Sequence, residues 1–351
     1  MGDVLRTLPA VCALRESRPE ARISWLVEPR SAGAVELCPA VDEILLFPRE
    51  ELAERLSQGR IVSFMRSLNR LRTGLRDPGF DCVLDFHGLL KSGILSRLTG
   101  SALRVGYARP QARECSWIFN HRRVDLPHPH CSRFERNRAL VAALGMWVDP
   151  SGPVIEVPDS AHLRMLSALE PSTRPTLLHP GTSEVAVHKR WSPRRFAALA
   201  RRVREATGRA CLVLSGPLAS EVDLQRRVVE ASEGAAIPAP QTPTLPDLAA
   251  LLREGSVFVG ADSGPLHMAS LLGTPVLQLL GPTDPVHNEP YAGTPWRRAH
   301  VPLSCSPCRR GCESVECMES LTVDLAWQQL QTLWQSAKGP PHANPMDQVR
   351  P

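Results

Sequence analysis

The segment GADSGPLH in the second half of the chain combines residue types that bind phosphate groups. It follows the apolar run SVFV and precedes the stretch MASLLG, so a helix should begin near Ser263. The start of a helix offers free backbone N–H groups and a positive dipole end to a diphosphate, and His267 in the first turn can donate to a phosphate oxygen. The alternative is a plain strand-to-helix turn in which Asp262 caps the helix and His267 is packed. The chemically suited residues are Asp262, Ser263, Gly264 and His267.

A lysine stands just before another expected helix, in the segment HKRWSP. Lys189 is one of only three lysines, beside Lys91 and Lys338, in a chain whose other basic residues are arginines. Where arginine is the usual cation, a lysine at such a place supplies a compact ammonium charge that a guanidinium cannot replace. Chance composition is the alternative.

Four cysteines with the spacing C-x2-C-x3-C-x4-C form a third candidate constellation. Four thiolates can hold a zinc ion or an iron–sulfur cluster, but this spacing is shorter than that of a usual zinc ribbon. We therefore favour free thiols in a loop over a structural metal, and we expect the six other cysteines to be core residues. The four are Cys305, Cys308, Cys312 and Cys317.

The composition is that of a soluble globular protein with no membrane-spanning segment. Hydrophobic residues make up 43% and charged residues 22% of the chain, and the apolar runs are too short for a membrane helix. The first residues lack the long apolar core of a secretory signal, and ten cysteines without a regular framework indicate reduced thiols. We therefore expect a cytoplasmic protein.

The net charge of +5 comes entirely from the N-terminal part of the chain. Residues 1–150 hold 22 Lys+Arg against 17 Asp+Glu, whereas the rest holds equal numbers. A basic face of this kind attracts phosphate groups on a sugar, a lipid surface or a nucleic acid, although a solvated amphipathic helix is an equally good explanation. Aromatic residues do not alternate with the arginines, so we expect no nucleic-acid partner. Much of the excess lies in Arg55, Arg60, Arg66, Arg70, Arg72 and Arg76.

Apolar runs alternate with helical patterns along the whole chain. Strands are expected at 21–29, 41–48 and 80–88, with a helical pattern at 50–76. A Pro-rich passage follows Leu144, and a second alternating series then begins with PTLLHPG. This pattern predicts an α/β fold with two Rossmann-like domains, in which ligands bind at the carboxyl ends of the strands. We expect domains at 1–150 and 151–336 and a disordered tail at 337–351.

Several motifs, in order, resemble the lipopolysaccharide heptosyltransferases of glycosyltransferase family 9. They are GDVLRTLPAV, LDFHGLLKSGILSRLTG, VGYARPQARECSW, HPGTSEVAVHKRWSP, LVLSGPLASE and GADSGPLHMASLLGTPVLQLLGPTDP. The resemblance covers roughly residues 1–330 and is greatest for heptosyltransferase I, which adds the first heptose to Kdo. It implies a GT-B fold of two Rossmann-like domains facing across a cleft. It also implies an N-terminal acceptor domain and a C-terminal domain that binds ADP-heptose.

The resemblance also implies roles for the donor-side residues. The Asp262–His267 segment matches the donor-binding loop, and Lys189 matches a lysine that neutralises the donor phosphates during catalysis. Thr182 and Ser183 would add hydroxyl groups to the same diphosphate. Glu221 resembles an acid that binds the ribose or the adenine edge, and the alternative is an ordinary first-turn acid.

In the acceptor domain, Asp3 matches the aspartate of a motif S-x-x-G-D that closes the loop after the first strand. It would be the general base that takes the proton of the acceptor hydroxyl. The strand that normally precedes this motif is missing from the sequence, which we attribute to a start codon assigned too late, a true truncation being the alternative. Arg113 matches an acceptor-side arginine, and Arg66 is a further candidate from the basic segment.

These implications define a metal-independent, inverting glycosyltransferase without a cofactor. It would move heptose from ADP-L-glycero-D-manno-heptose to Kdo-lipid A, working at the anionic cytoplasmic face of the inner membrane. The alternatives are a heptosyltransferase II or III with a heptose acceptor, a truncated inactive homologue that binds ADP-sugars, and a nucleotide-sugar epimerase of the same architecture.

Overall fold

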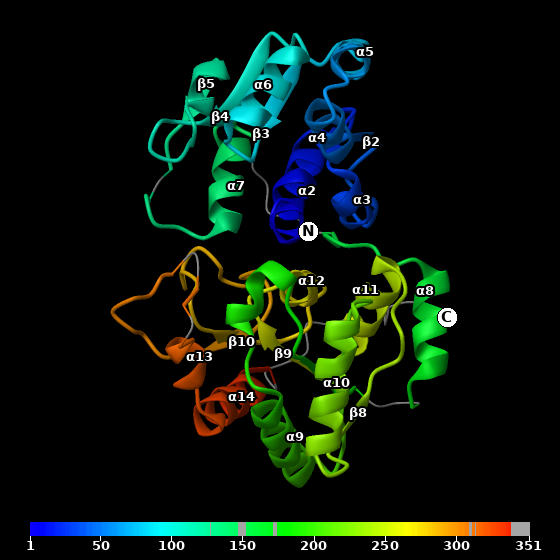
Figure 1. The fold of residues 1–351 in the computed structure, drawn as a ribbon, viewed down its shortest axis with the longest axis vertical. Helices are drawn as coiled ribbons and strands as arrows, with labels where there is room; N and C mark the ends of the chain where they lie inside the picture. The colour runs from blue at the N-terminus through cyan, green and yellow to red at the C-terminus, as the bar shows by residue number, and fades with distance from the viewer. Residues whose placement is uncertain (127, 147–151, 171–173, 309–310, 313, 338–351) are drawn as a thin grey trace, which may run out of the picture. The chain divides into compact units, whose positions relative to one another are not determined.

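The computed structural model describes residues 1–126, 128–146, 152–170, 174–308, 311–312 and 314–337. The chain divides into two compact units between Glu156 and Val157, inside the Pro-rich passage. Unit 1 contains Asp3–Glu156 and unit 2 contains Val157–Pro351 (Figure 1). The expected disordered tail lies outside the described residues apart from its first residue, Ala337, which ends the last helix.

The described residues of unit 1 form five short parallel strands in two separate sheets. One sheet pairs β1 (Ser24–Val27) with β2 (Glu43–Leu46), and the other has the order β3 (Cys82–Asp85), β4 (Leu103–Tyr107), β5 (Arg122–Val124). No described strand joins β1 to β3, so the backbone edges of the two sheets are not connected. The helices are α1 (Gly2–Leu5), α2 (Leu8–Ser17), α3 (Pro29–Glu36), α4 (Arg49–Ser57), α5 (Ile61–Arg76), α6 (Leu90–Leu98) and α7 (Arg133–Ala142), with a 3-10 turn at Ser116–Phe119.

Local sequence signals explain where the helices of unit 1 begin. Helix α2 has Pro9 in its first turn, where the missing N–H of proline costs no hydrogen bond. Helix α7 starts with a capping box, since Ser132 and Glu135 each bond the other's backbone N–H. Tyr107 at the end of β4 is buried and donates to Asn137 of α7 at 3.0 Å, which ties this helix to the sheet.

Unit 2 contains one six-stranded sheet whose paired strands all run parallel. Its order is β11-β10-β9-β6-β7-β8, so the chain builds outward from β6 first on one side and then on the other. The strands are β6 (Thr176–His179), β7 (Cys211–Val213), β8 (Ala236–Pro238), β9 (Val257–Ala261), β10 (Val276–Leu280) and β11 (Trp296–His300). The helices are α8 (Asp159–Ala168), α9 (Pro193–Thr207), α10 (Ala219–Ala231), α11 (Leu245–Glu254), α12 (Gly264–Leu271), α13 (Glu316–Glu319) and α14 (Val323–Ala337), with a 3-10 segment at Glu184–Lys189.

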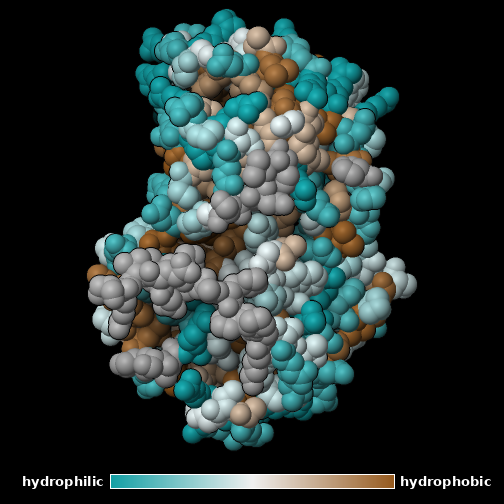
Figure 2. Space-filling model, turned by 180° about the vertical axis from the view of Figure 1, so that it is seen from behind, coloured by the Kyte–Doolittle hydropathy of each residue, from teal (hydrophilic) through white to brown (hydrophobic). Residues whose placement is uncertain are grey.

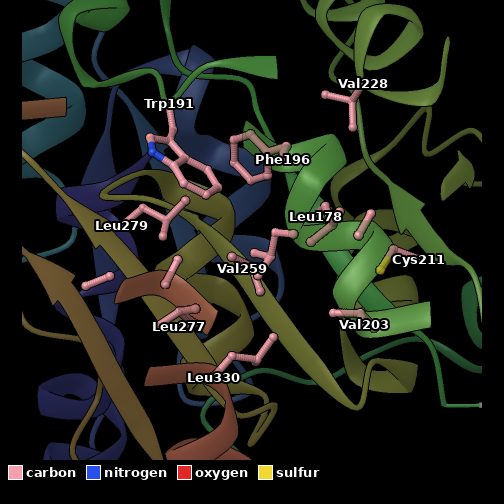
Figure 3. Packing of buried hydrophobic residues seen from close by; sticks show 14 of the residues in the cluster. Leu178, Trp191, Phe196, Val203, Cys211, Val228, Val259, Leu277, Leu279 and Leu330 are labelled. Carbon is pink, nitrogen blue, oxygen red and sulfur yellow. The ribbon is translucent and has the colours of Figure 1, made fainter. Parts of the chain in front are cut away.

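The core of unit 2 is formed by the sheet, α9 and α14, and part of it is shown in Figure 3. Trp191 packs edge-on against Phe196 with ring centroids 5.1 Å apart, and its indole N–H donates to the carbonyl of Leu321 at 2.8 Å. Helix α9 ends at Gly208, whose φ of 73° suits a left-handed C-cap. These contacts hold the segment before α9, which contains Lys189, against the sheet.

The mainly hydrophilic surface (Figure 2) agrees with the sequence composition, in which 22% of the residues are charged. In the view of Figure 2 hydrophilic surface predominates, and hydrophobic surface appears in small groups. Among the described residues, no helix combines the length and the apolar character needed to cross a bilayer.

Candidate functional site

The candidate donor site lies where β6 and β9 run side by side in unit 2. These strands pair in register, with His179 opposite Gly260, so the loops that follow them leave the same edge of the sheet. The strand order reverses at this place, because β7 and β8 continue on one side of β6 and β10 and β11 on the far side of β9. Open α/β sheets bind ligands at such switch points.

Three predicted residues from the two loops are joined by hydrogen bonds. The Lys189 ammonium donates to Asp262 Oδ2 at 2.9 Å, and His267 Nε2 lies 3.1 Å from the other carboxylate oxygen, Oδ1. His267 is fully buried and Asp262 is buried, whereas the Lys189 side chain is 20% exposed. Asp262 therefore holds Lys189 in place at the surface from a fixed, buried position.

This arrangement differs from the simple expectations for the individual residues. Asp262 does not cap the helix: Ser263 is the N-cap residue of α12, and it makes no side-chain cap bond. His267 contacts Asp262 from a fully buried position, so in this structure its Nε2 points to a carboxylate and not to solvent. The Ser263 hydroxyl is buried and has no hydrogen-bond partner among the described residues. A buried hydroxyl beside the free N–H groups of a helix start suits an anionic oxygen.

The loop after β6 is fixed by an arginine that the sequence reasoning missed. Arg190 donates from Nε to the Thr182 hydroxyl at 3.1 Å and from Nη2 to the Thr182 carbonyl at 3.0 Å. The Thr182 hydroxyl in turn donates to the Ala186 carbonyl at 2.9 Å, so it already has partners within the loop. Ser183 is exposed and its hydroxyl caps no helix. In the sequence, only its position next to Lys189 indicated that Arg190 could contribute to this loop.

Glu221 lies over two glycines at neighbouring strand ends. A side-chain carbon built on Gly216 would be 2.2 Å from Glu221 Oε2, and one built on Gly181 would be 2.9 Å from Oε1. Both positions therefore require glycine if the carboxylate is to stay where it is. Desolvation raises the pKa of Glu221, against a backbone hydrogen bond from Leu218 and the charge of Arg190. The carboxylate connects the loop after β6 with the loop after β7.

In unit 1, Asp3 is the first acid of α1 and is held by two arginines. It accepts hydrogen bonds from Arg133 Nη1 at 2.7 Å and from Arg6 Nη1 at 3.3 Å, and its side chain is 74% exposed. Desolvation alone would raise the pKa of Asp3, but Arg133 and then Arg6 outweigh it, so that the pKa is lowered. Asp3 is therefore an ionised, accessible carboxylate. Arg133 was not predicted from the sequence.

The two acceptor-side arginines lie on different elements. Arg113 is exposed in the loop after β4, and its backbone N–H donates to the Gly88 carbonyl at 2.9 Å, which links the loops that follow β3 and β4. The β3 loop is made rigid by Asp85, whose carboxylate accepts from the backbone N–H groups of His87 and Gly88. Arg66 is exposed on α5, and no hydrogen bond or ion pair joins it to another described residue.

The cysteines are all free thiols. The four of the C-terminal constellation line a small cavity of about 30 Å³ together with His188. Among the described residues, no three of these thiols lie close enough to one another to hold a single ion. The expectation that the remaining six are core residues is correct for Cys12, Cys38, Cys131 and Cys211. It is wrong for Cys82 and Cys115, which are exposed because one begins an edge strand and the other lies in a left-handed turn.

The chain is similar to known proteins over most of its length. The model of glycosyltransferase family 9 (heptosyltransferase) matches residues 68–319. Lipopolysaccharide heptosyltransferase 1 of Pseudomonas aeruginosa is 28% identical over 318 residues, which are 88% of this chain and 83% of that protein. Lipopolysaccharide heptosyltransferase 3 of Escherichia coli is 23% identical over 301 residues, or 83% of this chain and 84% of that protein.

Two solved structures are similar over almost the whole chain. The Escherichia coli heptosyltransferase WaaC with ADP has a TM-score of 0.73 at 21% identity, covering 95% of this chain and 97% of that one. The Escherichia coli ADP-heptose lipopolysaccharide heptosyltransferase II has a TM-score of 0.69 at 19% identity, with 96% and 97% covered. The predicted fold class, a GT-B fold of two Rossmann-like units, is thereby confirmed.

Proposed function

Because this chain belongs to glycosyltransferase family 9, the heptosyltransferases of lipopolysaccharide core synthesis, we propose that it transfers heptose from ADP-L-glycero-D-manno-heptose to Kdo of the inner core. The observation that carries the proposal is the Lys189–Asp262–His267 group at the β6–β9 switch point. It supplies a positioned cation beside a helix start, which suits the diphosphate of a nucleotide sugar.

The donor diphosphate binds between Lys189 and the start of α12. The Lys189 ammonium, the Ser263 hydroxyl and the backbone N–H groups of Gly264 and Leu266 stabilise the negative charge that grows on the leaving ADP. Asp262 keeps the ammonium at this place, and Thr182 and Ser183 line the neighbouring loop. The same charge stabilisation removes the need for a metal ion, so we propose a reaction without metal or cofactor. Glu221 accepts hydrogen bonds from the ribose or the adenine edge.

Asp3 takes the proton of the acceptor hydroxyl. The hydroxyl oxygen forms a bond to the anomeric carbon of heptose from the face opposite ADP, the bond from this carbon to the diphosphate oxygen breaks, and the configuration inverts. Arg133 holds the Asp3 carboxylate in its ionised form. Arg113 binds the carboxylate of Kdo, for which a guanidinium fork is suited, and Arg66 is the second acceptor residue.

The proposed place of this reaction is the cytoplasmic face of the inner membrane. The excess of basic residues in the N-terminal part supports attraction to an anionic leaflet, where the Kdo-lipid A acceptor is embedded. In this proposal unit 1 binds the acceptor and unit 2 binds the donor. Lipopolysaccharide heptosyltransferase 3 among the relatives supports a second candidate, transfer to a heptose already present on the core.

The decisive experiment incubates the purified protein with ADP-heptose and Kdo-lipid A and weighs the product by mass spectrometry. We expect a product heavier by one heptose, and its loss in the variants Lys189→Ala and Asp3→Asn. Product formation only on an already heptosylated acceptor would establish the second candidate. Release of free sugar without any acceptor would indicate an epimerase, and ADP binding without turnover would indicate an inactive homologue.

A further inference from the structure

Helices α5 and α6 carry exposed hydrophobic side chains on neighbouring turns. Ile61, Val62 and Met65 of α5 are 54%, 66% and 55% exposed, and Ile94 of α6 is 43% exposed. Ile61 and Val62 lie side by side in the first turn of α5 and Met65 lies one turn later, and Met65 and Ile94 line the same depression. Single exposed apolar residues are ordinary, but a group of this kind on adjoining helices marks an interaction site.

Arginines without counter-charges surround these residues. Arg66, Arg70, Arg72 and Arg97 are exposed, and none of their side chains has an ion pair or hydrogen bond to another described residue. Neither α5 nor α6 contains an Asp or Glu. Elsewhere in the chain many exposed arginines pair with carboxylates, such as Arg226 with Asp223 and Glu230. The uncompensated charge of α5 and α6 is therefore available to an external anion.

The two helices enclose an open groove of about 380 Å³, which we name the α5–α6 groove. Its lining alternates hydrocarbon and guanidinium groups, and Arg76 crosses to the end of α6, where its Nε donates to the Leu98 carbonyl at 3.2 Å. Figure 1 shows both helices at the end of unit 1 that lies away from the chain's N-terminus, and Figure 2 shows hydrophobic among hydrophilic surface at that end. The lining residues are Met65, Leu68, Asn69, Arg72, Arg76, Ile94, Arg97 and Leu98.

We propose that the α5–α6 groove, with the exposed first turns of α5, docks unit 1 onto an anionic phospholipid bilayer. The arginines bind lipid phosphates, and Ile61, Val62 and Met65 enter the boundary between headgroups and acyl chains. An interfacial helix has this composition, with a basic face beside an apolar one and a low overall hydrophobicity. Long arginine side chains reach the phosphates while their methylene stems stay in contact with apolar surface.

Two other occupants of the groove fit the observations less well. A second copy of this chain in a two-fold interface would bring like-charged arginines opposite one another. A single-stranded nucleic acid would find phosphate-binding arginines, but among the groove's described lining residues there is no aromatic side chain on which bases could stack. The apolar turn at Ile61 and Val62, next to unpaired arginines, fits the boundary between lipid headgroups and acyl chains.

The docking proposal rests on the proposed function for the presence of a membrane-embedded acceptor, but its test needs neither donor nor acceptor. The full chain is sedimented with vesicles of phosphatidylcholine alone and of phosphatidylcholine mixed equally with phosphatidylglycerol. The test variants are Arg72→Gln with Arg97→Gln, and Ile61→Ser with Val62→Ser. The matched control is Leu163→Ser with Arg209→Gln, which removes the same kinds of exposed group from unit 2.

We expect binding to the anionic vesicles only, weakened by salt. The arginine variant should bind about 30-fold less tightly, since each basic residue near the surface adds about 1 kcal/mol and 1.4 kcal/mol is a factor of ten. The serine variant should also lose binding, the control should not, and thermal unfolding should show every variant to be folded. Equal binding of both vesicle types, or unchanged binding of both test variants, would overturn the proposal.

Further measurements identify the occupant of the groove. They also distinguish failure of the docking proposal from failure of the proposed heptose transfer. Binding of an oligonucleotide that competes with the vesicles and is lost in R72Q/R97Q would assign the groove to nucleic acid. A dimer in solution that dissociates in the serine variant would assign it to a second copy. Vesicle binding by a chain that shows no heptose transfer would refute the proposed function and leave the docking surface in place.

Discussion

Asp262 is the central residue of the candidate donor site. It is buried between the Lys189 ammonium, which follows β6, and the His267 ring, which lies in the first turn of α12. An unpaired carboxylate could not stay ionised in such surroundings, so the lysine and the histidine stabilise it while it fixes the lysine. Asp262 thus positions the ammonium group that we propose to bind the donor diphosphate.

Replacing Asp262 by Asn should impair catalysis more than folding. The amide is nearly isosteric but cannot balance the ammonium charge, so Lys189 should move from its place. We expect kcat to fall roughly 10- to 100-fold, the range that loss of a supporting partner typically causes, with a smaller change in the KM for ADP-heptose. Steady-state kinetics of Asp262→Asn measure this, with the exposed Asp324→Asn as control. Wild-type kinetics in the Asp262 variant would contradict the positioning role.

The pH dependence of the reaction should reflect the pKa of Asp3, which Arg133 lowers. The arginines lower the pKa of Asp3, so the folded enzyme keeps this base ionised to a lower pH than an isolated carboxyl would allow. Arg133→Gln should raise the pKa of Asp3 and shift the acid limb of the kcat/KM profile to higher pH. The exposed Arg122→Gln is the control. If the acid limb of the kcat/KM profile does not shift in Arg133→Gln, Asp3 is not the general base.

At the scale of elements, the loops after β6, β7 and β9 form the candidate donor site because their strands are neighbours. Glu221 of α10 reaches Gly181 and Gly216 across two strand ends, where a side-chain carbon would collide with it. Arg190, just before α9, holds the Thr182 backbone. The sheet order therefore assembles residues that are distant in sequence.

Gly216→Ala should act on the donor through Glu221 alone. The new methyl group would meet Glu221 Oε2 at 2.2 Å, and because this oxygen ends a flexible side chain, the carboxylate should move while the backbone stays. We expect a raised KM for ADP-heptose with kcat less affected, measured beside Gly152→Ala, where nothing lies within 4 Å. A fall in kcat at unchanged KM would show that Glu221 serves the chemical step and not nucleotide binding.

His179 at the end of β6 should make stability depend on pH. Burial lowers its pKa to about 4, so the folded state binds this proton less readily than the unfolded chain does. The stabilisation is complete above the ordinary pKa of 6.5 and is lost as the pH falls from 6.5 toward 4, up to about 3 kcal/mol. Urea unfolding of His179→Gln should show a smaller loss in this window than wild type. The exposed His128→Gln should leave the wild-type loss unchanged.

How much the sequence predicts depends on how far apart the cooperating residues lie. The α/β alternation is a local pattern, and so is the presence at Ser263 and Lys189 of residue types that bind phosphate. Both could be predicted from the sequence. The bond from Lys189 to Asp262 spans 73 positions and depends on β6 lying beside β9, which periodicity does not specify. The same holds for Arg133, which is 130 positions from Asp3.

At the scale of the whole molecule, each unit has a hydrophobic core cluster of its own. Among the described residues, one cluster lies in unit 2 and another surrounds Tyr107 and Leu140 in unit 1. The residues proposed to bind ADP all belong to unit 2. Ligand binding should therefore stabilise one part of the chain more than the other.

Calorimetry with and without ADP tests whether the nucleotide stabilises unit 2 more than unit 1. We expect ADP at about 100 times its Kd to stabilise unit 2 by about 2.7 kcal/mol and to raise the midpoint of the transition that contains unit 2. Lys189→Ala should reduce the shift, whereas Asp3→Asn should not. Equal ADP-induced shifts in wild type and in Lys189→Ala would place the nucleotide elsewhere.

The order of strands in unit 2 has a consequence for how the protein acquires its activity. Strand β9 is made after β7 and β8 but must pair with β6, so the two halves of the donor site meet only when a long loop closes. Contacts of such separation in sequence form slowly. During refolding, ADP binding should therefore recover later than the helix content. Binding of the nucleotide would then report the final step of folding.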